Sequence, residues 1–428
     1  MMVGIFYTQK SKDRVGLFLI LKRRDTMLDP NYLLHISEGA ERISEELHQY
    51  IILKIIERMM IRIGRGDDYL LTSQDKFQLE VLQESGYLLE DIRQELVRKS
   101  KAQEKEIKEA MEEAGIKALA YDDAVYQAAG LSPTPLLQSP YLIRIMQRNY
   151  EATLGEWNNF TRTTANASQQ AFIKAMDKAY NLTSSGTISY TQAVKGAVDE
   201  IAKYGVRVEY PSGRTDTIET ATLRAVRTGI SQMSGQITEA RMDEMNWDIV
   251  LTSAHLGART GNGGENFTNH YWWQGKFFSR SGKDKRFLPF SVCGMGDVQG
   301  IHGANCRHSH GPGDGENNPF EKYDSEENRK RYDLEQRQRE LERRIRKTKR
   351  EVMGWGTAVD NAKDENLKFE LSMKYNRKSA LLQKQNKDYD AFCKEHNLKK
   401  LSDRIRIAKW DRSQAARARE AAKNYLNH

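Results

Sequence analysis

Apolar residues recur every three or four positions along most of this chain of 428 residues, which is the spacing of one face of an α-helix. The most regular series is Leu223, Val226, Ile230, Met233, Ile237 and Ala240. It predicts a helix over Thr220–Met242 whose apolar seam packs on a partner, either within the chain or on another subunit. The pattern stops between Ser253 and Gly313. We therefore predict an α+β protein that is predominantly α-helical, with long amphipathic helices and a small β-containing domain.

The N-terminal half contains further helical patterns. One long helix is predicted over Asp29–Met60. A second begins near Ser73, and the mixed charge of its middle, residues 98–113, indicates a solvent-exposed arm rather than a core element. Beyond a proline-rich linker, the spacing predicts a helix from Pro140 and another over roughly 168–180.

Short strands are predicted at two places. Apolar and polar residues alternate up to Tyr210, and Pro211-Ser212-Gly213 follows as a turn, which together predict a β-hairpin. The apolar run Trp247–Leu251 predicts a strand that leads towards His255. No internal repeat is visible, which argues against solenoids and propellers.

Linkers and a shift in charge divide the chain into predicted parts. Residues 1–26 are a candidate non-native extension, because Met27 opens a plausible helix entry. The remaining parts are an N-terminal helical region (27–130), a central α+β region ending in a motif domain (140–313), and a basic helical or coiled-coil tail (320–428). A second break in the helical pattern is expected at Gly354-Trp355-Gly356, within the tail.

The positive charge of the chain belongs to this tail. From Phe320 onward there are 29 Lys and Arg against 19 Asp and Glu, whereas the whole chain carries +8. A basic region of this kind indicates a polyanion partner such as double-stranded DNA, bound through its phosphates. A solvated basic helix face is the alternative. The candidate nucleic-acid-binding residues are Arg343, Arg344, Arg346, Lys347, Lys349 and Arg350.

Residues with distinctive chemistry gather between Ser253 and Gly313. This interval holds five of the nine histidines and two of the three cysteines. Imidazole and thiolate groups are the ligands of structural zinc, so zinc is the candidate cofactor. The candidate metal ligands are His255, His270, Cys306, His308 and His310.

Two other interpretations of this cluster stay open. The spacing lacks the CxxC pair of zinc ribbons and the HExxH of zinc proteases, so the same side chains could be hydrogen-bonded groups of a loop-rich domain. An enzyme could instead use Cys306 as a thiolate, or a metal-activated water for phosphodiester hydrolysis. No general base stands close to the cluster in the sequence, and we therefore expect no enzymatic activity.

Composition excludes several other classes of protein. No apolar run reaches the ~18 residues that a membrane-spanning helix needs, so no membrane partner is expected. Three cysteines do not make a disulfide framework in a chain of this length, which favours a cytosolic origin.

The ordered motifs of the cluster resemble one known family. Ser253-Ala254-His255 with Arg259, then His270 with Trp273-Gln274-Gly275-Lys276, then Asn305-Cys306-Arg307-His308, are similar to the tailed-phage minor capsid proteins of the minor capsid protein 2 type, distant relatives of Mu F-like head morphogenesis proteins. Six residues of these motifs are expected to have a structural role, through packing and hydrogen bonds: Arg259, Trp273, Gln274, Gly275, Asn305 and Arg307.

This resemblance implies a non-enzymatic head protein of a phage or prophage. Such a protein associates with the portal vertex and assists head assembly and DNA packaging or ejection. Its partners would be portal and capsid proteins, and it would lie in the virion, at the portal vertex or capsid interior, after assembly in the host cytoplasm. A metal-dependent nuclease or other hydrolase is the alternative. One departure from many relatives is the Gly/Asn-rich insertion Thr260–Asn269, which separates His255 from His270.

Overall fold

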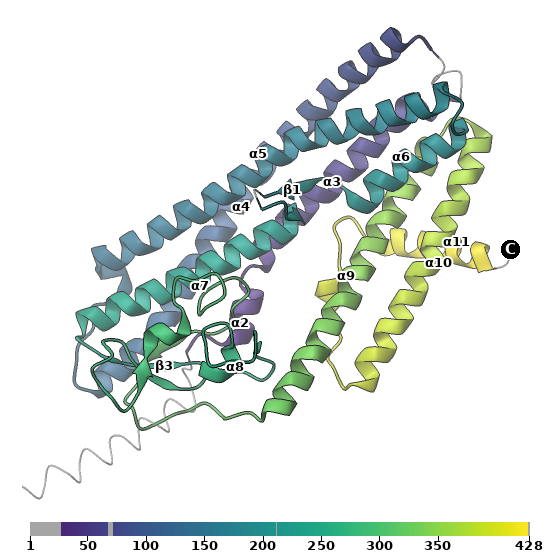
Figure 1. Ribbon diagram of the computed structural model, residues 1–428. Helices are drawn as coiled ribbons and strands as arrows, with labels where there is room; N and C mark the ends of the chain where they lie inside the picture. Colours follow the sequence, from purple (N-terminus) through teal and green to yellow (C-terminus); the bar gives the residue numbers. More distant parts are fainter. Residues whose placement is uncertain (1–26, 67–71, 211, 427–428) are drawn as a thin grey trace, which may run out of the picture. The chain divides into compact units, whose positions relative to one another are not determined.

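The computed structural model describes residues 27–66, 72–210 and 212–426 (Figure 1). Helices form most of this part of the chain, which confirms the predicted α+β, predominantly helical class. The helices are α2 (Pro30–His35), α3 (Glu38–Ile63), α4 (Gln74–Ala128), α5 (Pro140–Ser184), α6 (Tyr190–Tyr204), α7 (Ile218–Glu244), α8 (His270–Trp273), α9 (Ser325–Asn361), α10 (Glu365–Glu395) and α11 (Arg412–Leu426), with single 3₁₀ turns at Leu136–Gln138, Phe290–Cys293 and Ser402–Ile405. The predicted extension at 1–26 lies outside the described residues.

The chain forms two compact units. The first comprises residues up to Ala40, Glu104–Trp157 and Leu223–Glu335, and the second comprises Glu41–Gln103, Asn158–Thr222 and the residues from Gln336 onward. Both units therefore combine segments that are far apart in the sequence. The four-part division predicted from linkers stays a prediction.

The first unit has a helical core in which α7 packs against α2, α4 and α5. The predicted seam of α7 is confirmed, because Val226, Ile230, Met233, Ile237 and Ala240 are all buried there. The expected solvent-exposed arm is wrong. Within that stretch of α4, the residues Gln103, Ile107 and Met111 are buried, and the charged residues between them lie on the opposite face of the same helix.

The first unit also contains a small sheet with the order β5-β4-β3-β6. Its strands are β3 (Ile249–Thr252), β4 (Phe277–Ser279), β5 (Leu288–Pro289) and β6 (His310–Pro312). The central strand β3, which the sequence predicts, pairs antiparallel with both β4 and β6. Loops fill the rest of the interval and pack around buried Trp273 and Phe278.

The second unit contains the predicted hairpin, formed by β1 (Arg207–Glu209) and β2 (Thr215–Thr217). It also contains the C-terminal helices: α9 contacts α10 through Gln338 and Tyr389, and α10 packs against α11. Figure 1 shows α9 and α10 side by side.

Three predicted helix boundaries are wrong. The N-terminal helix is divided into α2 and α3, because the first ends in a turn at Ile36-Ser37. The two helices predicted after Pro140 are one continuous helix, α5. The expected break at Gly354 does not occur, because α9 continues to Asn361. Gly354 allows close packing instead: a Cβ there would meet the Ala202 methyl at 2.7 Å.

Candidate metal centre

The local folding of the motif domain brings its distant histidines and cysteine together. His270 begins the short helix α8, which Asn269 caps by accepting a hydrogen bond from the Trp272 backbone N–H at 3.1 Å. Cys306 and His308 come directly before β6, and β6 pairs with β3 in a register that sets His310 opposite Thr252. Thr252 in turn donates to the carbonyl of Trp273, at the end of α8, at 3.0 Å.

A strained turn positions Cys306. Both His302 and Asn305 have left-handed backbone conformations, with φ values of 60° and 58°. Asn tolerates this region better than most side chains, because its short amide can bond locally. The turn is closed by the Cys306 backbone N–H, which donates to the Gly303 carbonyl at 3.1 Å. The sequence motif Asn-Cys-Arg-His therefore has a conformational reason for its asparagine.

Three ligand atoms meet at one buried point. His270 Nδ1 lies 3.3 Å from His308 Nδ1, and Cys306 Sγ lies 3.7 Å and 3.8 Å from these two nitrogens. Zinc–nitrogen and zinc–sulfur bonds of about 2.1 Å and 2.3 Å at tetrahedral angles would set such atoms about 3.4 Å and 3.6 Å apart. The three separations match a tetrahedral zinc site within a few tenths of an ångström.

Hydrogen bonds on the outer ring nitrogens turn both imidazoles towards this point. His308 Nε2 lies 3.1 Å from Gln274 Oε1, and His270 Nε2 lies 2.8 Å from the Gln299 carbonyl. Gln274 Oε1 is an acceptor, so His308 Nε2 carries its proton and His308 Nδ1 presents a lone pair. His270 Nε2 lies between the Gln299 carbonyl, which accepts, and the Arg259 guanidinium at 2.7 Å, which donates. This arrangement is the outer-shell support that metal-bound histidines usually have. The His308 backbone N–H adds a hydrogen bond to Cys306 Sγ at 3.4 Å.

The electrostatics keep both imidazoles neutral. Burial, together with the charge of Arg259, lowers the pKa of His270 to about 3. Burial also holds the pKa of His308 well below its usual range. The same burial raises the pKa of the Cys306 thiol. A bound metal would attract the two ring nitrogens and the sulfur and would deprotonate the thiol.

The remaining motif residues surround the three ligand atoms. Trp273 is buried against the rings of His270 and His308. Arg259 donates to the Gln299 carbonyl at 2.6 Å, so the carbonyl that holds His270 is itself fixed. Gln274 also accepts from the His255 backbone N–H at 3.0 Å.

Two motif residues support the loops rather than the ligand atoms. Gly275 has a φ of 62°, and a Cβ there would approach the Ala254 methyl to 3.2 Å. Arg307 donates to Glu335 of α9 at 3.2 Å. A second residue of α9, Asn328, accepts hydrogen bonds from the backbone N–H groups of Gly257 and Ala258 at 2.8 Å and 2.9 Å.

The structure places two candidate ligands outside the ligand group. The His255 ring stacks on His308 at a centroid distance of 4.5 Å, and its Nδ1 faces the Leu256 carbonyl at 3.1 Å. His310 belongs to a separate chain of contacts with His302 at 2.8 Å and Glu239 at 3.0 Å. Three of the five sequence candidates therefore come together.

Sequence reasoning missed several members of these networks. Gln299, Asn328, Glu335 and Glu239 lie outside the motifs and come from other loops or helices. No local sequence pattern marks them, since each acts through a long-range contact. His302 could have been found from the sequence, because it belongs to the histidine-rich interval.

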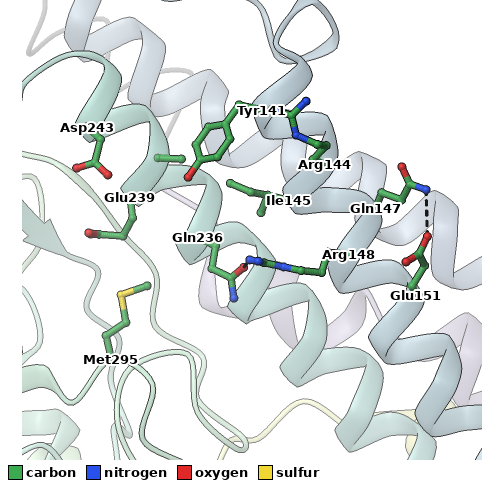
Figure 2. Close-up of a pocket in the computed structure, with 11 residues that line it drawn as sticks. Tyr141, Arg144, Ile145, Gln147, Arg148, Glu151, Gln236, Glu239, Asp243 and Met295 are labelled. Atoms are coloured by element: carbon green, nitrogen blue, oxygen red, sulfur yellow. Dashed lines mark hydrogen bonds between the residues drawn. The ribbon is translucent and has the colours of Figure 1, made fainter.

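A separate pocket of about 570 Å³ lies between α5 and α7 in the first unit, outside the ligand group (Figure 2). Arg148 of α5 donates to Gln236 of α7 at 3.1 Å, and Gln147 donates to Glu151 at 3.0 Å. Glu239 lines this pocket and accepts a hydrogen bond from His310, the first residue of β6.

The six candidate nucleic-acid-binding residues of α9 have different environments. Lys349 is buried and donates to the Ile405 carbonyl at 2.6 Å, and Arg350 pairs with Glu45 and Glu219. Arg344 pairs with Glu340 on the helix surface. The other three, Arg343, Arg346 and Lys347, line a pocket together with Arg350.

These features define a helical protein with a loop-rich domain built around a histidine–cysteine centre. The family model of phage minor capsid protein 2 matches residues 28–387. The chain therefore belongs to the phage minor capsid protein 2 family, which confirms the resemblance. No curated protein and no solved structure matches the chain. Among the described residues, no helix is both long and apolar enough to cross a membrane.

Proposed function

We propose that this phage minor capsid protein associates with the portal vertex and assists head assembly and DNA packaging or ejection. Family membership supports a structural role in the virion with other phage proteins as partners. The excess of basic residues from Phe320 onward supports a contact between the C-terminal region and double-stranded DNA. Portal and capsid proteins are the proposed protein partners.

We propose further that the motif domain is a structural module that docks on another head protein and is stabilised by a zinc ion. The observation that carries this proposal is the meeting of His270 Nδ1, Cys306 Sγ and His308 Nδ1, all within 4.8 Å of one another. A metal that crosslinks α8 to the turn before β6 would add stability to this loop-rich domain.

Burial favours a structural over a hydrolytic centre. His270, Cys306 and His308 are only 1%, 2% and 1% exposed, so a phosphodiester substrate has no direct approach to the ion. In the part of the chain that the structure describes, the ligand group holds no carboxylate. A hydrolytic metal site needs a general base within hydrogen-bonding reach of the attacking water.

Metal analysis of the full-length protein tests this proposal. We expect about one zinc ion per chain, lost in Cys306→Ser, and a lower melting temperature for this variant and for chelated wild-type protein. Cys293→Ser is the matched control, because Cys293 is buried in the same apolar cluster but lies outside the ligand group. It should keep the zinc.

The same variants separate the structural from the enzymatic interpretation. Metal-dependent DNA cleavage by the wild type that disappears in Cys306→Ser would establish a nuclease and overturn the structural proposal. A loss of head incorporation and stability in Cys306→Ser, with no cleavage in either protein, would support it. Equal zinc content in both cysteine variants would show that the ligand group does not hold the metal.

A further inference from the structure

A basic pocket of about 290 Å³ lies in the second unit. We define it by its cationic lining, which is Lys203, Arg207, Arg343, Arg346, Lys347 and Arg350. Two carboxylates, Asp216 and Glu219, also line it. The pocket forms where the end of α6, the β1–β2 hairpin, the start of α7 and one face of α9 meet. Its positive charge therefore comes from segments more than a hundred residues apart. The basic composition of the tail alone does not reveal such a pocket.

Ion pairs neutralise the buried Arg350 at the inner wall of the basic pocket. Arg350 pairs with Glu219 at 2.5 Å and with Glu45 at 3.2 Å, and Glu219 also contacts His48 at 2.8 Å. Burial disfavours the charged form of Arg350, but these carboxylates outweigh it and raise the pKa of Arg350. Asp216 pairs with Arg214 at 3.3 Å. These ion pairs neutralise Arg350. The net positive charge of the pocket therefore comes from the other cations, which we call the outer cations: Lys203, Arg207, Arg343, Arg346 and Lys347.

The outer cations are oriented by neutral groups, which leave their charge intact. Arg346 donates to the Arg404 carbonyl at 2.7 Å, and Arg207 donates to the Tyr204 carbonyl at 3.1 Å. The ammonium groups of Lys203 and Lys347 lie 4.9 Å and 5.8 Å from the centre of the Tyr204 ring. Carbonyl and ring contacts hold these side chains in place without neutralising them.

Two further features favour an anion at this position. Arg343 and Lys347 are exposed and one helical turn apart on α9, so both reach the same side of the pocket mouth. Thr217 and Thr220 bring the N-terminus of α7 to the pocket wall. The positive end of a helix of this length adds to the attraction for a phosphate group.

We propose that the basic pocket binds a phosphate group of a DNA backbone. This inference rests on the proposed DNA contact and specifies its location. Arginine side chains suit phosphate because their planar donors can bind two oxygens at once. The pocket uses Arg343, Arg346 and Lys347 of α9, and it adds Lys203 and Arg207 from other elements.

The experiment compares two double variants of the full-length protein. Arg343→Gln with Lys347→Gln removes two exposed charges from the pocket. Lys330→Gln with Arg337→Gln removes two exposed charges from the same helix, where the two side chains pair with Glu326 and Glu340. Binding of duplex DNA is measured at several salt concentrations. Stabilisation by inorganic pyrophosphate is measured separately as a shift in melting temperature.

The pocket variant should bind DNA at least 10-fold more weakly than wild type, with a salt slope smaller by about 0.9, because the one phosphate contact of the pocket is lost. Pyrophosphate should stabilise the wild type and the control but not the pocket variant. Equal weakening by both variants would overturn the pocket while leaving a DNA-binding region in place. Pyrophosphate binding without any DNA binding by the wild type would overturn both the assignment to DNA and the proposed function on which it rests.

Discussion

Glu239 shows how a single residue of the first unit combines burial with charge. It accepts a hydrogen bond from His310 at 3.0 Å and pairs with Arg280 at 2.8 Å, and it also lines the pocket of Figure 2. Burial alone would raise its pKa. The hydrogen bond and charge of His310, together with Arg280, outweigh burial and lower the pKa of Glu239 to about 2.

Glu239→Gln should therefore destabilise the protein in a pH-dependent way. The pKa of Glu239 is lower in the folded than in the unfolded state, so its stabilisation is present above pH ~4.5 and is lost as the pH falls towards ~2. At pH 7 we expect a loss of up to about 3 kcal/mol, by linkage from the pKa shift. Chemical denaturation at pH 7 and at pH 3 would measure this difference.

Asp243→Asn is the control for this prediction. Asp243 pairs with the same Arg280 at 2.6 Å but is largely exposed, so its replacement should cost no more than about 1 kcal/mol. A Glu239→Gln variant as stable as wild type at pH 7 would show that the His310 contact does not stabilise the folded state.

Helix α7 is the element that the sequence predicts best, since its 3-4 spacing can be satisfied only by a helix with one buried face. Boundaries set by tertiary contacts are predicted worst. The stretch around Gly354 looks like a break, yet the helix continues, because the glycine allows the Ala202 methyl to approach. The charged middle of α4 looks exposed, yet Ile107 and Met111 on its other face complete the helical core.

Ile230→Asp should destabilise the first unit by about 3 kcal/mol or more, because it would bury an unpaired carboxylate among apolar side chains. Ile230 is 0% exposed within the helical core. Gln232→Asp puts the same side chain on the exposed face of α7, where a change within about 1 kcal/mol is expected. Thermal or chemical unfolding of both variants checks this. Equal stability of the Ile230→Asp and Gln232→Asp variants would show that the apolar seam of α7 is not part of a core.

At the scale of the whole molecule, the sequence predicts where the candidate site lies better than it predicts how the side chains of the site are arranged. Its motifs identify His270, Cys306 and His308 among five candidates, because their residue types carry the chemistry. The sequence could not distinguish these three residues from His255 and His310. Which side chains meet depends on the pairing of β3 with β6 and on the turn at Asn305. The charge excess of the tail is likewise visible in composition, whereas the burial of Lys349 is not.

The full-length protein should bind duplex DNA without sequence preference and with strong salt dependence. If about five phosphates are contacted, log K should fall with log[salt] at a slope of about −4.5. Fluorescence anisotropy with two unrelated duplexes at several salt concentrations measures both properties. Binding that is insensitive to salt, or no binding at low salt, would leave the C-terminal region as a protein-binding surface.

The burial of the histidine–cysteine centre has a kinetic consequence. An ion held by side chains that are 1% to 2% exposed can leave only when α8 or the turn before β6 opens. Metal release would then be as slow as that opening, whatever the affinity of the site. A zinc ion taken up while the chain folds would then stay bound in the assembled particle.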